Sequence, residues 1–98
     1  MILEDKYKMH QEISKHLYEA YVKKNRAYGD SFSKTFKEFG NVSAITMLFH
    51  KCNRVMALSK ESNILKNYEA LEDSLMDLSN YSIMYLIELQ QKYKYSDD

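Results

Sequence analysis

The strongest constraint on the fold is how rarely the sequence breaks a helix: it contains no proline and only two glycines, Gly29 and Gly40. Proline and glycine are the residues that most often interrupt helices, so long helices can run between these positions and the chain ends. Apolar residues recur at steps of three and four, and the alternation typical of strands is weak. The sequence therefore predicts one all-α domain over residues 1–98, with helices at about 3–27, 34–39, 42–59 and 67–93.

The stretch KNRAYGDSF, residues 24–32, separates the first long helix from the short one. Gly29 can adopt the left-handed conformation that ends many helices. Asp30, Ser31 and Ser33 are candidate N-caps for the short helix, because their side-chain oxygens can accept hydrogen bonds from its first N–H groups. Gly40 then ends the short helix. The expected architecture is a bundle of three main helices and one short helix.

The composition narrows the class of function. Lys and Arg together number 14, as do Asp and Glu, so the formal net charge is zero. This balance argues against broad binding to nucleic acid or to anionic membranes, both of which attract basic surfaces. No apolar run approaches the roughly 20 residues of a membrane-spanning helix, and the N-terminus is charged too early for a signal peptide. The single cysteine, Cys52, cannot form an internal disulfide, so the chain is expected to be cytoplasmic. Its apolar neighbours at helical spacing assign Cys52 to the core.

Residues 81–89, YSIMYLIEL, are apolar nearly all round the helix. A helix that is apolar on every side is buried on every side, and one neighbouring helix cannot cover that much surface. We therefore expect oligomerisation to complete the bundle, as a homodimer or larger homo-oligomer formed through this segment.

Charge is unevenly distributed between the last two predicted helices. Residues 40–60 contain no acidic residue but include Lys51 and Arg54, whereas the last helix begins with an acidic cluster. Glu69, Asp73 and Asp77 are four residues apart and share one helix face, where like charges repel. Three explanations remain open: ion pairs with Lys51 and Arg54 or solvated charge, a polar site for a nucleotide, and a Mg²⁺ site built from the three carboxylates.

Three stretches of the chain carry a family resemblance: KNRAYGDSF, HKCNRVMAL and YEALEDSLMDLSNYSIMYLIEL. Their order and spacing, over about residues 18–90, resemble the phage-enriched nucleotide-modification-associated domain family of the first type. That family is similar in turn to the all-α nucleoside triphosphate pyrophosphatases of MazG type, which hold Mg²⁺ over a triphosphate with acidic clusters on two helices. The matching residues are Lys24, Tyr28, Gly29, Ser31 and Phe32 in the first stretch, Lys51 and Arg54 in the second, and Glu69, Asp73, Leu75, Asp77, Leu78, Asn80 and Tyr81 in the third.

Two positions depart from the family pattern. Ala27 and His50 stand where the resembled family usually has Asp. Metal-assisted hydrolysis needs carboxylates that converge on the cation, and imidazole is a poor ligand for Mg²⁺. The resemblance therefore implies binding of a nucleotide or nucleotide-derived small molecule without turnover. One such use is a sponge that sequesters a nucleotide signal of host defence; a phage-encoded protein would do so in the host cytoplasm.

The resemblance and the side-chain chemistry together suggest a pocket between the first corner, the basic face and the acidic helix. Tyr28 offers a flat face on which a nucleobase could stack, and Ser31 at a helix start could meet a phosphate. The alternative is that Tyr28 is a core aromatic that closes a helix corner. The predicted nucleotide-binding residues are Lys24, Tyr28, Asp30, Ser31, Lys51, Arg54, Asn80 and Tyr81. The predicted metal ligands are Glu69, Asp73 and Asp77, and no catalytic residue is assigned.

Two other functions remain open. One is a Mg²⁺-dependent nucleoside triphosphate pyrophosphohydrolase, and Mg²⁺ is the only cofactor expected, in that case alone. The other is a small helical oligomer that acts as a protein-interaction module. Release of pyrophosphate would favour the enzyme, whereas stabilisation by a nucleotide that is recovered intact would favour the binder.

Overall fold

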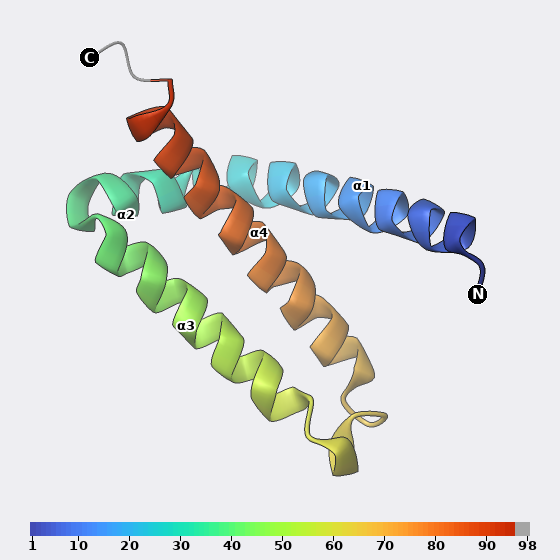
Figure 1. The fold of residues 1–98 in the computed structure, drawn as a ribbon. Helices are drawn as coiled ribbons and strands as arrows, with labels where there is room; N and C mark the ends of the chain where they lie inside the picture. Colours follow the sequence, from blue (N-terminus) through green and yellow to red (C-terminus); the bar gives the residue numbers. More distant parts are fainter. Residues whose placement is uncertain (96–98) are drawn as a thin grey trace. The chain divides into compact units, whose positions relative to one another are not determined.

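The computed structural model describes residues 1–95 and contains four α-helices (Figure 1). These are α1 (Leu3–Tyr28), α2 (Ser31–Phe39), α3 (Asn41–Leu58) and α4 (Tyr68–Tyr93), and a 3-10 turn, Glu61–Asn63, lies between α3 and α4. No strand occurs among residues 1–95. The prediction of an all-α fold is therefore confirmed. No helix within the described range has the length and apolar character required to cross a membrane.

The chain divides into two compact units. The first, Met1–Ser31, is essentially the single helix α1, which contains no buried residue. The second begins at Phe32 and contains the rest of α2 together with α3 and α4. The tertiary packing described below belongs to the second unit.

Two glycines end helices, as predicted. Gly29 follows α1 with φ 63° and ψ 40°, the left-handed conformation, and its N–H donates to the Asn25 carbonyl. Asp30 also has a positive φ, 58°, and its N–H donates to the same carbonyl at 3.2 Å. This pair of left-handed residues turns the chain at once, so α2 begins at Ser31. The predicted start near residue 34 was too late, because Ser33 is a buried residue inside α2 rather than its cap.

Gly40 connects α2 to α3 in a conformation that L-residues avoid. Its φ is 72° and its ψ is −156°. Its N–H donates to the Phe36 carbonyl at 2.7 Å, and its own carbonyl accepts the Ser43 hydroxyl at 2.7 Å. The corner between the two helices is therefore fixed by a glycine-specific backbone with hydrogen bonds on both sides.

Gly40→Asn should lower the free energy of unfolding by about 1–3 kcal/mol, because this backbone region is essentially restricted to glycine. Steric clash is not the cause, since an added Cβ would meet no atom within 4 Å. The matched control is Gly29→Asn, because Asn tolerates the left-handed conformation and should cost less than about 1 kcal/mol there. Urea denaturation followed by circular dichroism measures both, and equal losses would contradict the assignment of strain to Gly40.

Helices α3 and α4 are antiparallel neighbours joined by residues 59–67 (Figure 1). Their register follows from two contacts: Lys51 meets Asp77, and Arg54, three residues later, meets Ser74, three residues earlier. At the C-terminal end of α3, the N–H of the C-cap residue Ser59 donates to the Val55 carbonyl at 2.9 Å. The antiparallel pair is the frame on which the candidate site is built.

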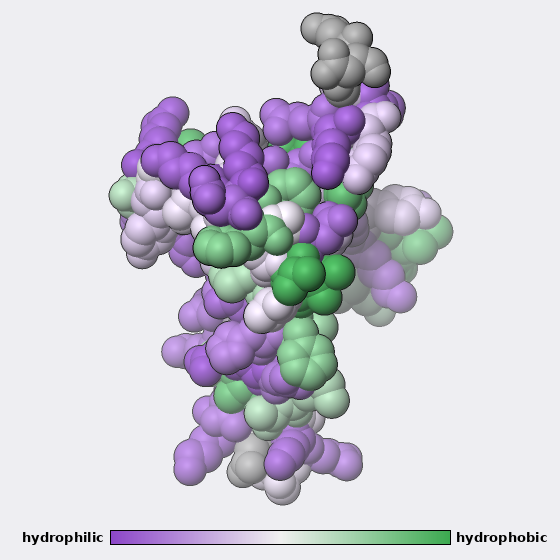
Figure 2. Space-filling model, turned by 90° about the vertical axis from the view of Figure 1, so that its left-hand side faces the viewer, coloured by the Kyte–Doolittle hydropathy of each residue, from purple (hydrophilic) through white to green (hydrophobic). Residues whose placement is uncertain are grey.

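The core is small. Among the described residues, the buried apolar side chains are Phe36, Ala44 and Leu71. Many large apolar side chains stay exposed, and Figure 2 shows green patches of them among the hydrophilic residues of one face. On α3 these are Val42, Ile45, Met47, Phe49 and Met56, and on α4 they include Leu75, Ile83, Leu86 and Ile87.

The assignment of Cys52 to the core is wrong, because its side chain is exposed. The sequence grouped it with Ile45, Leu48, Phe49, Val55 and Met56 as one apolar side of the helix. In the structure Leu48 and Val55 are half-buried, whereas Ile45, Phe49 and Met56 are exposed with Cys52. Helix α3 is apolar over two adjacent faces, and its neighbour α4 covers one of them.

Candidate functional site

The basic face of α3 meets α4 through two polar contacts. Lys51 Nζ lies 3.3 Å from Asp77 Oδ2, and both side chains are partly buried. Arg54 Nε donates a hydrogen bond of 3.1 Å to Ser74 Oγ, and Ser74 is buried. The predicted facing of cations and carboxylates is thus present for Lys51 and Asp77, whereas Arg54 pairs with a hydroxyl.

Local sequence spacing explains why these four side chains meet. Lys51 and Arg54 are three residues apart, so they lie on one face of α3, and Ser74 and Asp77 have the same spacing on α4. In an antiparallel helix pair the residue order is reversed, so Lys51 lies opposite Asp77 and Arg54 lies opposite Ser74.

Aromatic rings extend the same surface toward the C-terminal half of α4. The Lys51 ammonium lies 5.1 Å from the centroid of the Tyr81 ring, within the range of a cation–π interaction. The Tyr81 ring meets Phe32 of α2 edge to face, with centroids 5.8 Å apart. One turn further on, the Tyr85 hydroxyl donates to Asn41 Oδ1 at 3.0 Å. Lys51 is therefore held between a carboxylate and an aromatic face.

The predicted metal ligands are not drawn together. Glu69 and Asp73 are exposed, and Asp77 is the member of the set that contacts α3. Within residues 1–95, no group of three or more His, Cys, Asp or Glu side chains is placed so that it could hold a metal ion. The neighbouring acid Glu72 accepts a hydrogen bond of 3.3 Å from the Tyr68 hydroxyl.

The other predicted nucleotide-binding residues lie in two places. Asn80 is half-buried on α4, beside Tyr81 in sequence. In the first unit, Lys24 lies on the last turns of α1 and Tyr28, exposed, is its final residue. Asp30 and Ser31 form the turn into α2. The Tyr28 ring is exposed, so it is not the core aromatic of the alternative explanation.

Sequence reasoning missed Ser74 and the Tyr85–Asn41 hydrogen bond. The signal for Ser74 was weak: it is a small polar residue three positions before Asp77, on the same helix face. Asn41 carried no signal at all, because its partner is 44 residues away and depends on the register of α3 against α4.

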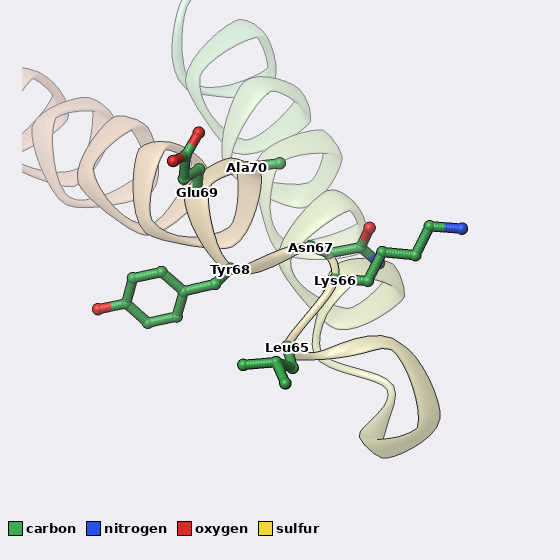
Figure 3. A pocket seen from close by; sticks show the side chains of 6 residues that line it. All are labelled: Leu65, Lys66, Asn67, Tyr68, Glu69 and Ala70. Carbon is green, nitrogen blue, oxygen red and sulfur yellow. The ribbon is translucent and has the colours of Figure 1, made fainter.

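A hollow of about 500 Å³ lies at the start of α4 (Figure 3). Its lining is the consecutive segment Leu65, Lys66, Asn67, Tyr68, Glu69 and Ala70. Figure 3 shows that these side chains diverge, with Tyr68 and Leu65 pointing to one side and Lys66 to the other. Because a binding site needs polar groups that converge, the α3–α4 contact surface is the stronger candidate.

Comparison with known families agrees with the motif resemblance. A family model described as nucleotide modification associated domain 1 matches residues 24–89. The matched range contains every predicted nucleotide-binding residue and every predicted metal ligand. No curated protein and no solved structure shows significant similarity to this chain. With about two thirds of its length matched, the chain belongs to the nucleotide modification associated domain 1 family.

Proposed function

We propose that this protein binds a nucleotide or nucleotide-derived small molecule, without hydrolysing it, at the α3–α4 surface around Lys51 and Tyr81. The supporting observation is the position of Lys51 between Asp77 and the Tyr81 ring. A nucleotide needs a cation for its phosphates and a flat face for its base, and these two groups are adjacent here. Membership of the family supplies the association with nucleotides.

The α3 side of the surface offers cations to an anionic ligand. Lys51 and Arg54 are one turn apart on α3, and no Asp or Glu occurs on that helix. Arg54 bonds to Ser74 through Nε, which leaves the guanidinium's outer NH₂ groups for bidentate contact with phosphate. Asn80 is the amide that could read the base edge. The first-unit residues Lys24, Tyr28, Asp30 and Ser31 remain a separate proposal, as nucleotide contacts of their own unit, on the strength of the family pattern.

Binding is favoured over hydrolysis by the side chains at two positions. Ala27 has no ligand atom, and His50 offers a nitrogen, whereas Mg²⁺ prefers carboxylate oxygens. The biological use that fits binding without turnover is sequestration of a nucleotide signal, as in counter-defence by a phage. The enzyme alternative would need Asp77, Glu69 and Asp73 to converge on Mg²⁺, and among the described residues they do not form such a group.

A thermal-shift screen with a nucleotide panel, followed by recovery of the ligand, tests the proposal. A ligand at about 100 times its Kd should add roughly 2.7 kcal/mol of stability. Binding without turnover predicts a raised Tm and an intact nucleotide. Release of pyrophosphate in the presence of Mg²⁺, lost on Asp77→Asn, would establish the enzyme instead. A stable protein that no nucleotide stabilises would point to the protein-interaction module.

Lys51→Met should weaken nucleotide binding by about tenfold or more, because a charge-assisted contact to phosphate contributes roughly 1.5–3 kcal/mol. The measurement is isothermal titration with the nucleotide that gives the largest thermal shift. Lys60→Met is the matched control, since Lys60 is exposed just beyond α3 in the same unit. Equal affinity for the two variants would remove Lys51 from the site, and Tyr28→Ala would then test the first-unit residues separately.

A further inference from the structure

Ser74 carries a buried hydroxyl whose partner is a cation on the neighbouring helix. The residue is 5% exposed, and its Oγ accepts the Arg54 Nε–H at 3.1 Å. The exposed serines of the same helix behave differently: Ser79 and Ser82 donate to carbonyls four residues earlier, which is a common bond for a serine inside a helix. The Ser74 hydroxyl instead forms a tertiary contact between α3 and α4.

This contact fixes the orientation of the Arg54 side chain. A guanidinium is planar, with one N–H on Nε and four more on its two NH₂ groups. Holding Nε therefore sets the plane and the direction of the whole group. Arg54 as a residue is exposed, although its Nε contacts a buried side chain. Four donors on a fixed plane thus remain for an anion, in the geometry that suits bidentate binding of phosphate.

The two cations of the surface are anchored differently. Lys51 Nζ lies 3.3 Å from Asp77 Oδ2, so a carboxylate compensates part of its charge. Arg54 is anchored by a neutral hydroxyl, and within residues 1–95 no carboxylate forms an ion pair with it. A neutral anchor orients the guanidinium and leaves its charge uncompensated. Arg54 is therefore the less compensated of the two cations that a phosphate would meet.

We propose that Ser74 is a positioning residue of the nucleotide site, which holds the Arg54 guanidinium ready for the phosphate without neutralising it. This inference rests on the proposed function, and it gives a role to a side chain that touches no ligand itself. An unanchored arginine loses rotamer freedom when it binds, at a cost equivalent to about a three- to tenfold loss of affinity. The bond to Ser74 meets that cost before the nucleotide arrives.

Exchange of the arginine Nε–H protons, followed by NMR, tests the anchor in the protein without ligand. The chain has two arginines, Arg26 and Arg54, and Arg26 is exposed on α1. The Arg54 Nε–H should exchange more slowly than that of Arg26, because it is held in a hydrogen bond to a buried group. Ser74→Ala should remove this protection. Equal exchange of the two arginines in the unmodified protein would overturn the positioning role.

Titration with inorganic phosphate at constant ionic strength, followed by the backbone amide signals of α3 and α4, tests the consequence for binding. Ser74→Ala should raise the phosphate Kd by about three- to tenfold. Ser79→Ala is the matched control and should leave the Kd unchanged, since the Ser79 hydroxyl bonds within its own helix. In an Arg54→Met background, Ser74→Ala should cause no further loss, because Ser74 acts through Arg54.

Ser74→Asp separates orientation from charge. The carboxylate still accepts from Nε, so the Arg54 proton should stay protected, but the new ion pair compensates the guanidinium. The phosphate Kd should therefore rise by about tenfold or more, as for loss of a charge-assisted contact. Unchanged phosphate binding by Ser74→Asp would contradict the requirement for a neutral anchor.

The outcomes distinguish this inference from the proposed function. A phosphate Kd unchanged by Ser74→Ala, or a loss that persists in the Arg54→Met background, would overturn the positioning role and leave nucleotide binding in place. The same conclusion follows if a nucleotide raises the Tm of a protein whose amide signals phosphate does not move. A protein that binds neither phosphate nor any nucleotide would overturn the proposed function, and the role of Ser74 with it.

Discussion

Ala44→Asp is expected to abolish the folded α2–α4 unit. Ala44 is 0% exposed, and it lies four residues before Leu48 and seven before Lys51, on the face of α3 that packs against α4. A carboxylate placed there loses its hydration and gains no cation of its own, a cost on the order of several kcal/mol. Small domains have a total stability near the lower end of about 5–15 kcal/mol. The variant should show a largely unfolded circular dichroism spectrum.

Ala57→Asp is the matched control for this prediction. Ala57 is exposed on the same helix, so the same substitution there changes helix propensity and surface charge without burying a carboxylate. Its expected cost is below about 1 kcal/mol. If both variants lost comparable stability, the effect would come from aspartate in α3 and burial of Ala44 would not be its cause.

Phe36→Ala should lower the free energy of unfolding by about 3–5 kcal/mol, the range for truncation of a buried phenylalanine. Phe36 is 8% exposed, and its ring centroid lies 6.0 Å from that of Tyr85. Removing the ring leaves a cavity and deprives Tyr85 of its aromatic neighbour. The midpoint of urea denaturation, followed by circular dichroism, measures the loss.

Phe39→Ala makes the identical change three residues further along the same helix. Phe39 is 72% exposed, so its truncation removes little buried area and should cost well under 1 kcal/mol, about the size of ordinary surface substitutions. A Phe39→Ala loss as large as that of Phe36→Ala would show that Phe39 is covered in solution and that the packing of α2 differs from the structure described here.

The sequence predicted the helices because helix signals are local. Gly29 and Gly40 mark helix ends through their own backbone freedom, and the three-and-four spacing of apolar residues acts within one helix. The facing of a basic α3 and an acidic α4 was also predictable, since opposite charge density on consecutive helices favours their approach. Lys51 and Asp77 meet for this reason.

The partner of each side chain was decided by tertiary structure. Whether Arg54 meets a carboxylate or Ser74 depends on the axial register of α3 against α4, which the 59–67 connection and the packing at Ala44 determine together. The spacing of apolar residues also could not predict which face of α3 packs against α4, because the helix has two adjacent apolar faces. The sequence therefore determined where helices form, through interactions among near neighbours. Only the tertiary structure decided that Ala44 is buried and Cys52 exposed, because that outcome depends on contacts between residues far apart in the chain.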